Sequence, residues 1–238
     1  MSKEIRRAVI LAAGRGTRMG TMTQEIPKPM LPIGDKPMLE HIVDRLESAG
    51  LEKFLIVVGY GAKQIQKHFK GYEDKIEFAK QDPVNGTATA ALLAKEFAGS
   101  DAFLLTYGDI LCDPSAYRRA IELLLNKPAS AAIVAVKEVD DPWQGAAVYE
   151  LAGRITRIVE KPPQGTSVTR WNSAGFYIFK PGVFRYLERV QPSARDEFEL
   201  TSAIEMMVKD RLELHISPIT GTWRDVGRPE DLELARNA

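Results

Sequence analysis

The chain has 238 residues, of which 45% are hydrophobic and 27% are charged, as is typical of a soluble globular protein. Its 32 basic residues balance its 32 acidic residues, so there is no global positive field of the kind that nucleic-acid-binding proteins use. One cysteine excludes an internal disulfide and a cysteine-based zinc cluster, and any anion site must be local.

The first half of the chain alternates apolar strands with helices. Near-continuous apolar runs predict strands at 7–14, 53–60, 75–81 and 102–109. Helical spacing predicts helices at 36–50, 61–71 and 87–99, the last capped by Thr87 and ended by Gly99. This order indicates βαβ units and a parallel sheet covered on both faces, with ligands beyond the carboxyl ends of the strands.

The second half has a different texture. Strands are predicted at 129–139, at 173–182 and at 212–219, and two more surround a turn near Ala152 and Gly153 within 145–162. Short helices are predicted at 181–190 and 198–210, and Asp113 is a helix cap before Pro114. We therefore expect residues 1–238 to form a single α/β domain. Its Rossmann-like, doubly wound sheet is mixed but mainly parallel, with a small antiparallel extension.

The stretch "GRGTRMG", residues 14–20, follows the first strand and combines three glycines with two arginines. It fits neither G-x-G-x-x-G nor the P-loop pattern G-x-x-x-x-G-K-[ST]. Its backbone N–H groups can still form an anion-binding nest, and Arg18 can bind phosphate oxygens with two hydrogen bonds. A second glycine-containing segment, "GYGAKQ" at 59–64, is interpreted as a strand-to-helix connection. Lys28 lies between two prolines that stiffen its backbone.

"LAAGRGTRM" at 11–19 and "PKPML" at 27–31 resemble the nucleotide-binding signature of the sugar-1-phosphate nucleotidylyltransferases, the NDP-sugar pyrophosphorylases. The resemblance continues in order through "NGTATA", "TYGDI", "IVEKP", "NSAGFYIF" and "WRDVGRPEDL". It implies the nucleotide-diphospho-sugar transferase fold. It also implies the catalytic domain only, because the sequence contains no hexapeptide repeat of the kind that a fused acetyltransferase has in some members.

The resemblance implies an enzyme that joins a nucleoside triphosphate to a sugar 1-phosphate and releases pyrophosphate. Arg18 and the Gly14–Gly16 backbone would then hold the β- and γ-phosphates. Lys28 would neutralise charge at the α-phosphate, and Lys161 would hold the sugar phosphate. Such a reaction depends on positioning and charge neutralisation rather than on an acid or a base.

Asp109 and Asp225 match the metal-binding aspartates of the family. Mg²⁺ favours one or two carboxylates together with phosphate oxygens and water, so we expect Mg²⁺ as the cofactor. These two residues lie far apart in the chain and must be brought together by folding.

The residues implied to contact the nucleotide are Leu11, Ala12, Ala13, Gly14, Gly16, Thr17, Gln81, Gly86, Thr87 and Gly108. The Gln81 amide could pair a donor and an acceptor with the imide edge of uracil or thymine, which favours UTP or dTTP. Members that transfer adenylyl or guanylyl groups use related loops. The sugar-phosphate residues are Gly145, Glu160, Lys161 and Asn172. The sequence does not determine which sugar is used. Trp143 and Ala174 are interpreted as packing residues that could also shape the sugar pocket.

Three alternatives were weighed against this reading. A GTP-using guanylyltransferase of the mannose-1-phosphate type stays open, as does a non-catalytic regulatory module on the same fold, although such a module would lose the phosphate-binding charges. A glycosyltransferase is disfavoured because the chain lacks D-x-D. No apolar stretch approaches the roughly 20 residues that span a bilayer, and no signal peptide is evident, so we expect a cytoplasmic protein with no membrane or nucleic-acid partner. A homo-oligomer is compatible with the sequence.

Overall fold

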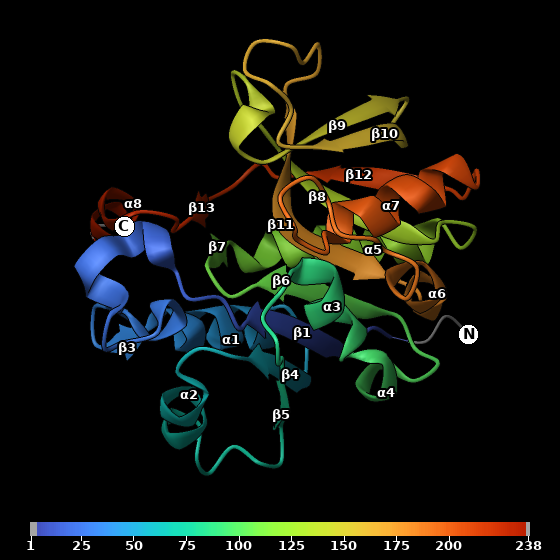
Figure 1. Ribbon diagram of the computed structural model, residues 1–238. Helices are drawn as coiled ribbons and strands as arrows, with labels where there is room; N and C mark the ends of the chain where they lie inside the picture. The colour runs from blue at the N-terminus through green and yellow to red at the C-terminus, as the bar shows by residue number, and fades with distance from the viewer. Residues whose placement is uncertain (1–3, 237–238) are drawn as a thin grey trace.

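A nine-stranded sheet forms the centre of the computed structural model, which describes residues 4–236 (Figure 1). Its strand order is β5-β4-β1-β6-β11-β8-β12-β10-β9. The half built from the first part of the chain contains β1 (Arg7–Ala12), β4 (Lys53–Val58), β5 (Ile76–Lys80) and β6 (Phe103–Tyr107). These four strands are parallel, so their carboxyl ends share one edge of the sheet.

The other half of the sheet is mixed. It contains β8 (Ala132–Glu138), β9 (Ala146–Leu151), β10 (Arg154–Glu160), β11 (Trp171–Phe179) and β12 (Leu214–Pro218). Strand β11 runs antiparallel to both β6 and β8, whereas β12 is parallel to β8. The expected α/β class, with its parallel sheet and antiparallel extension, is confirmed.

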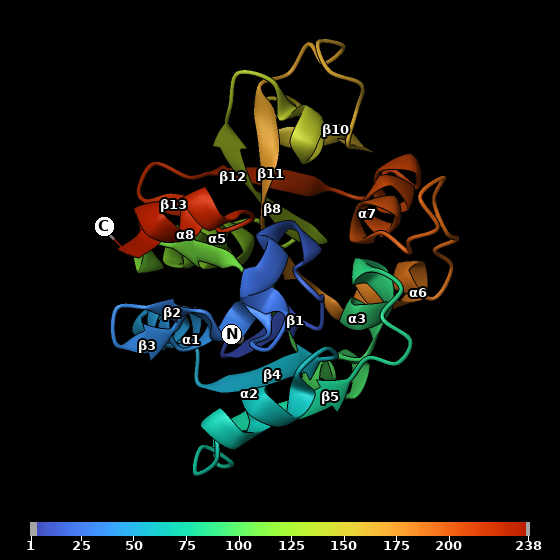
Figure 2. The ribbon, with the colours of Figure 1, turned by 60° about the vertical axis from the view of Figure 1, so that its left-hand side comes forward.

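Helices cover both faces of the sheet (Figure 2). One layer contains α1 (Met38–Ser48), α2 (Ala62–His68) and α5 (Pro114–Asn126), and the other contains α3 (Thr87–Leu92), α6 (Phe184–Leu187) and α7 (Leu200–Lys209). Alternate strand residues enter the two cores: Ala8 and Ile10 pack in the first, and Val9 and Leu55 in the second. Burial on both faces explains why these strands are apolar at nearly every position.

The helix expected at 87–99 is divided into α3 and α4 (Lys95–Ala98). Thr87 is the first residue of α3 and Gly86 is its N-cap, so the prediction of Thr87 as the cap was wrong. The Thr87 hydroxyl instead accepts a hydrogen bond from the backbone N–H of Leu200, at 2.9 Å. Asp113 does cap α5, because its carboxylate accepts from the Ser115 N–H at 2.7 Å.

Several short elements complete the fold. They are η1 (Thr17–Thr23), η2 (Lys28–Met30), β2 (Pro32–Ile33), β3 (Lys36–Pro37), β7 (Ile110–Cys112), η3 (Pro142–Gln144), η4 (Pro181–Val183), β13 (Trp223–Asp225) and α8 (Pro229–Arg236). The sequence patterns did not predict the β7–β13 pair or α8. None of the helices between residues 4 and 236 is long and apolar enough to cross a membrane.

Candidate active site

Two adjoining cavities open beyond the carboxyl ends of the parallel strands, and Arg18 and Gly227 line both of them. The larger cavity measures about 570 Å³ and the smaller about 370 Å³. Of the predicted residues, the larger cavity is lined by Leu11, Ala12, Ala13, Gly14, Gly16, Thr17, Arg18, Lys28, Gln81, Gly86, Thr87, Gly108 and Asp109. The smaller cavity is lined by Arg18, Gly145, Asn172 and Asp225. Most predicted site residues therefore meet at one place.

The glycine-rich stretch 14–20 leaves β1 and turns sharply into η1. Gly16 adopts a φ of 67°, and a Cβ atom there would lie 2.7 Å from Cβ of Lys28, so both its conformation and its packing require glycine. Arg18 follows on an exposed face, and within residues 4–236 it makes no hydrogen bond or ion pair. Its guanidinium is therefore available to an anion at the junction of the two cavities.

Lys28 is buried at the start of η2 and carries its ammonium to the end of β6. Its Nζ lies 2.5 Å from Oδ2 of Asp109. The flanking Pro27 and Pro29 fix the backbone on either side, as expected from the sequence. Lys28 thus balances one carboxylate of the site while lining the larger cavity.

Asp225 reaches Asp109 through the antiparallel pairing of β13 with β7. Asp225 is opposite Ile110, and the N–H of Val226 donates to the Asp109 carbonyl oxygen at 2.9 Å. Although part of Asp225 is open to solvent, limited hydration and the nearby Asp109 charge raise its pKa to about 6.

This pair of carboxylates fits a hard divalent cation. Oxygen atoms are the ligands that Mg²⁺ prefers, and it commonly takes only one or two carboxylates from the protein. In the described part of the chain, no three histidine, cysteine or acidic side chains gather as a metal cluster. Two protein carboxylates leave coordination positions of such an ion open to other oxygen ligands.

Gln81 is buried beneath the turn that begins α3. Its Nε2 donates to the Gly86 carbonyl at 2.8 Å and to the Thr89 hydroxyl at 2.9 Å. A carbonyl can only accept, so this contact fixes the orientation of the amide. Both amide hydrogens are engaged, and Oε1 accepts no hydrogen bond from the described residues. The residue type predicts that the Gln81 amide offers a base both a donor and an acceptor. In the structure it can offer only the acceptor.

The segment 195–201 connects the Gln81 turn with Glu160. The Phe198 N–H donates to the Asn85 carbonyl at 2.9 Å, and the Ala88 N–H donates to the Phe198 carbonyl at 2.8 Å. At the other end of the segment, the Thr201 hydroxyl donates to Oε2 of Glu160 at 3.0 Å. Residues on the two sides of the site are thus held by one stretch of backbone.

Glu160 lies in a cluster of charged groups. The Arg195 guanidinium is 2.8 Å from Glu199 and 3.6 Å from Glu160. Burial and the negative charge of Glu199 raise the pKa of Glu160, against the Thr201 hydrogen bond and the Arg195 charge. Glu160 lines neither cavity. Its contact with a sugar therefore stays a prediction.

Lys161 also lines neither cavity, but its backbone is unusual. It adopts a φ of 41°, in the left-handed region that lysine rarely occupies, and its N–H donates to the Gly145 carbonyl at 2.7 Å. Its side chain is exposed. Asn172, on the neighbouring β11, keeps its buried Oδ1 without a hydrogen-bond partner. An unpaired buried acceptor at a cavity wall suits a ligand hydroxyl.

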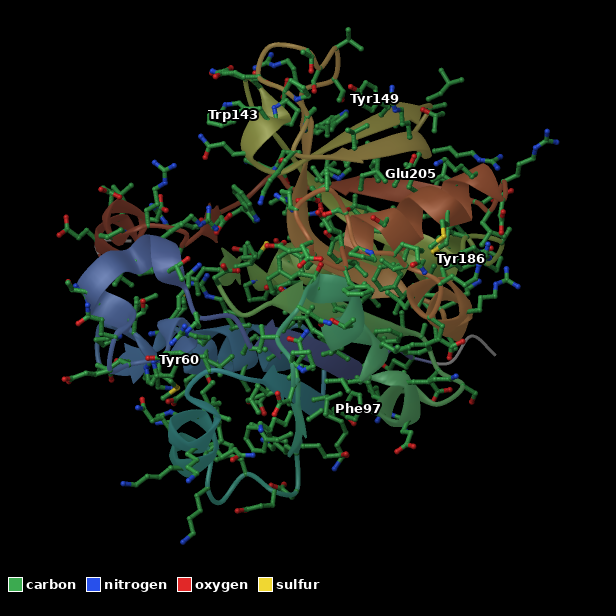
Figure 3. All side chains as sticks on the ribbon, viewed as in Figure 1. Tyr60, Phe97, Trp143, Tyr149, Tyr186 and Glu205 are labelled. Carbon is green, nitrogen blue, oxygen red and sulfur yellow. The ribbon has the colours of Figure 1, made fainter. Side chains whose placement is uncertain are left out.

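Some wall residues were not predicted as site residues: Asp141, Trp223 and Arg228 line the smaller cavity. Trp143, labelled in Figure 3 and offered by the sequence as a packing residue that could also shape the sugar pocket, lines the same cavity. The larger cavity includes Tyr107, Asn85, Asp196 and Glu197. Trp223, Arg228, Tyr107 and Asn85 lie within the quoted motifs, so proximity could have signalled them. Ala174 is fully buried, and its carbonyl accepts from Trp223 Nε1 at 2.8 Å, which is a packing role.

Comparisons with known proteins identify the family of this chain. A family model described as nucleotidyl transferase matches residues 7–238. The bifunctional protein GlmU of Methanococcus maripaludis is 37% identical over 97% of the chain and 53% of its own length. The chain thus spans about half the length of these GlmU relatives. The UTP–glucose-1-phosphate uridylyltransferase AglF of Haloferax volcanii is 34% identical, over 96% of the chain and 94% of AglF.

Two solved structures share the whole architecture. A UDP-glucose pyrophosphorylase complexed with UDP-glucose superposes with a TM-score of 0.87, at 26% identity, over 98% of this chain and 97% of that chain. A putative glucose-1-phosphate thymidylyltransferase from Bacillus anthracis gives a TM-score of 0.86 at 27% identity, over 97% and 94% of the two chains.

Proposed function

This chain belongs to the nucleotidyl transferase family, and from that membership we propose that it joins a nucleoside triphosphate to a sugar 1-phosphate and releases pyrophosphate. One observation carries the proposal. Arg18, Lys28, Asp109 and Asp225 converge where the two cavities meet. Each cavity can then hold one anionic substrate, and the charges at the junction lie where the two phosphate groups would react.

The proposed reaction is an in-line displacement at phosphorus. A phosphate oxygen of the sugar 1-phosphate attacks the α-phosphorus and forms the new P–O bond. The bond from the α-phosphorus to the bridging oxygen breaks, and pyrophosphate leaves with that electron pair. The attacking oxygen is already ionised at neutral pH, so no general base is needed. Catalysis then consists of positioning and neutralising negative charge.

The cationic side chains divide this task. Arg18 would bind the departing β- and γ-phosphates together with the backbone N–H groups of Gly14–Gly16. Lys28 would lie beside the α-phosphate, where its paired Asp109 is already held. Lys161 would bind the phosphate of the sugar: it follows β10 in a left-handed backbone conformation, its side chain is exposed, and its ammonium makes no hydrogen bond or ion pair with residues 4–236.

Asp109 and Asp225 would hold Mg²⁺. The ion would supply positive charge to the phosphate oxygens when bound. The support for this assignment is the oxygen-only donor set and the raised pKa of Asp225, which limited hydration and the nearby Asp109 charge produce together.

The base is proposed to be uracil or thymine. The free Oε1 of Gln81 can accept from the N3–H of an imide, whereas cytosine and adenine present an unprotonated ring nitrogen at the corresponding edge. Guanine also carries a ring N–H, so GTP is the alternative. AglF is a UTP–glucose-1-phosphate uridylyltransferase and the Bacillus anthracis protein a putative glucose-1-phosphate thymidylyltransferase. Their similarity to this chain favours UTP or dTTP, with glucose 1-phosphate as the first sugar to try.

A screen for pyrophosphate release tests the proposal. UTP, dTTP, GTP, CTP and ATP are each combined with a panel of hexose and N-acetylhexosamine 1-phosphates, with Mg²⁺ or with EDTA. We expect turnover with UTP or dTTP and none with EDTA.

Two variants sharpen that screen. Asp109→Ala should lose at least about 10²-fold in rate because charge stabilisation is lost. Glu205→Ala, an exposed helix residue labelled in Figure 3, should leave the rate unchanged. If no pair of substrates reacts, the chain is a binding module; if GTP is best, the assignment of Gln81 is wrong.

A further inference from the structure

The segment 59–64, which joins β4 to the first turn of α2, is hydrogen-bonded to residues on both sides of the glycine-rich stretch 14–20. The Tyr60 N–H donates to the Ala13 carbonyl at 3.0 Å, and the Tyr60 hydroxyl donates to the Gln24 carbonyl at 2.6 Å. Gln64 Nε2 donates to the Glu25 carbonyl at 2.8 Å. The sequence predicts that this segment only connects a strand to a helix. In the structure it also contacts both ends of residues 13–28, which we call the loop.

The same segment also supports the approach to Lys28. Gly61 has a φ of +68°, and a Cβ atom there would lie 2.5 Å from Cγ of Pro27. No side chain fits between the two backbones. The contacts of 59–64 thus extend from Ala13 to Pro27, the residue immediately before the buried Lys28.

Arg15 is held by the same tyrosine. Its guanidinium carbon lies 5.3 Å from the centre of the Tyr60 ring, and Arg15 forms no other hydrogen bond or ion pair with the described residues. Arg15 lines neither cavity, whereas Arg18 lines both. Stacking on Tyr60 therefore keeps one arginine on the outer side of the loop and leaves the other facing the site.

We propose that Tyr60 is a positioning residue that keeps residues 13–28 in the shape that receives the triphosphate. Gly14, Gly16 and Gly20 give the free loop many accessible conformations, and a ligand would have to order them on binding. Tyr60 orders them beforehand through its N–H, its hydroxyl and its ring. Figure 3 shows Tyr60 close to α2. The kinetic part of this inference rests on the proposed function; the loop-ordering part does not.

Limited trypsin digestion tests loop ordering without any activity. Arg15 and Arg18 are the trypsin sites in the loop, because Lys28 is followed by proline. Trypsin cleaves a loop of a folded protein only when the loop opens, so the cleavage rate reports the fraction of molecules in which the loop is open. Intact-mass measurement should show cleavage after Arg18 about fivefold faster in Tyr60→Leu than in the unmodified protein. Tyr60→Phe, which keeps the ring but loses the hydroxyl, should lie between them.

Tyr149→Leu is the matched control. Tyr149 is also a half-buried tyrosine with an arginine over its ring, Arg157 at 5.5 Å, but it lies on the β9–β10 hairpin. It should leave cleavage after Arg18 unchanged. Arg15→Gln removes the stacked cation while keeping Tyr60, and it should also accelerate cleavage after Arg18.

Steady-state kinetics then test the functional consequence. In Tyr60→Leu, kcat/KM for UTP or dTTP should fall about tenfold because the loop must be ordered by the substrate. KM for the sugar 1-phosphate should change less than twofold. A purely structural role would lower the folded fraction and affect both substrates alike.

The inference is overturned if Tyr60→Leu shows unchanged cleavage after Arg18, or if Tyr149→Leu accelerates that cleavage equally. It is also overturned if both substrates lose affinity together. Absence of turnover in the unmodified protein would instead contradict the proposed function. In that case the loop-ordering part is still tested by comparing how far UTP slows trypsin cleavage after Arg18 in each variant.

Discussion

Lys28 and Asp109 show how the role of one side chain depends on its neighbours. The two prolines around Lys28 predict a restrained cation, and the structure places that cation 2.5 Å from Asp109. Gln81 shows the opposite case. Its residue type allows a donor and an acceptor, but Gly86 and Thr89 use both amide hydrogens and leave an acceptor. Such selection among chemical options cannot be inferred from the residue alone.

Glu160 provides a residue-scale prediction about pH. Its pKa is raised by burial and by Glu199, while the Thr201 hydrogen bond favours the carboxylate and lowers it. Thr201→Val removes that hydrogen bond at nearly constant volume, so the pKa of Glu160 should rise further. A carboxyl group with a higher pKa stays protonated to a higher pH. The acid limb of kcat/KM for the sugar 1-phosphate should therefore move to higher pH.

Two comparisons check the Thr201 prediction. Thr201→Ser retains a hydroxyl and should keep the original profile. In both variants kcat/KM for the nucleoside triphosphate should keep its pH dependence, because Glu160 is assigned to the sugar. Coincident acid limbs in the Val and Ser variants would contradict the role of the Thr201 hydrogen bond.

At the scale of elements, the pairing of β7 with β13 brings Asp225 next to Asp109 in the site. The strand, glycine and aspartate at 102–109 predict where Asp109 lies, since carboxyl ends of parallel strands carry ligand-binding residues. Nothing local predicts where Asp225 lies. Three-residue strands have too little periodicity to be recognised, and this pair is formed by segments far apart in the chain. The resemblance to the family implied that Asp109 and Asp225 come together, and the structure shows the strand pair that brings their backbones side by side.

Trp223 anchors this ribbon and gives an element-scale prediction. Its Nε1 donates to the Ala174 carbonyl at 2.8 Å, which ties β13 to β11. Trp223→Phe keeps an aromatic ring but leaves that carbonyl unpaired. Urea denaturation should show a loss of about 0.5–1.5 kcal/mol. The Mg²⁺ concentration for half-maximal velocity should also rise, because Asp225 is less firmly held.

Trp171→Phe is the control for the Trp223 variant. The indole N–H of Trp171 makes no hydrogen bond with the described residues, so its loss should change neither stability nor the Mg²⁺ requirement by a comparable amount. Equal Mg²⁺ requirements in the two variants would show that the Trp223 hydrogen bond does not position Asp225.

At the scale of the whole molecule, both faces of the sheet are buried under helices. The apolar runs predicted this arrangement, because a strand exposed on one face would alternate polar and apolar residues. The helix at 87–99 was less predictable: its composition allows one continuous helix, whereas the structure divides it into α3 and α4. At its start, Thr87 and Ala88 are hydrogen-bonded to segment 195–201. The single-domain organisation of 1–238 and a homo-oligomer stay predictions.

Neighbouring residues of β4 test the double burial. Ile56 packs in the core with α1 and α5, and Leu55 packs in the core with α3 and α7. Ile56→Ala and Leu55→Ala should each lower the free energy of unfolding by about 2–5 kcal/mol, measured in urea. Val168→Ala, at a side chain that is 91% exposed, should change it by less than about 0.5 kcal/mol. A small effect at one of the two β4 positions would contradict a sheet covered on both faces.

The sequence by itself determined the α/β class, the order of most strands and helices, and the glycine-rich turn that follows the first strand. These features depend on local patterns: apolar periodicity, glycine where the backbone turns, and proline beside Lys28. Only the tertiary structure decided that Asp225 joins Asp109, that Gln81 offers an acceptor, and that Tyr60 holds the loop containing Arg18. Each of these depends on hydrogen bonds or packing between residues that are distant in the chain or that share one crowded turn. A local sequence pattern does not determine which of the available partners a side chain contacts.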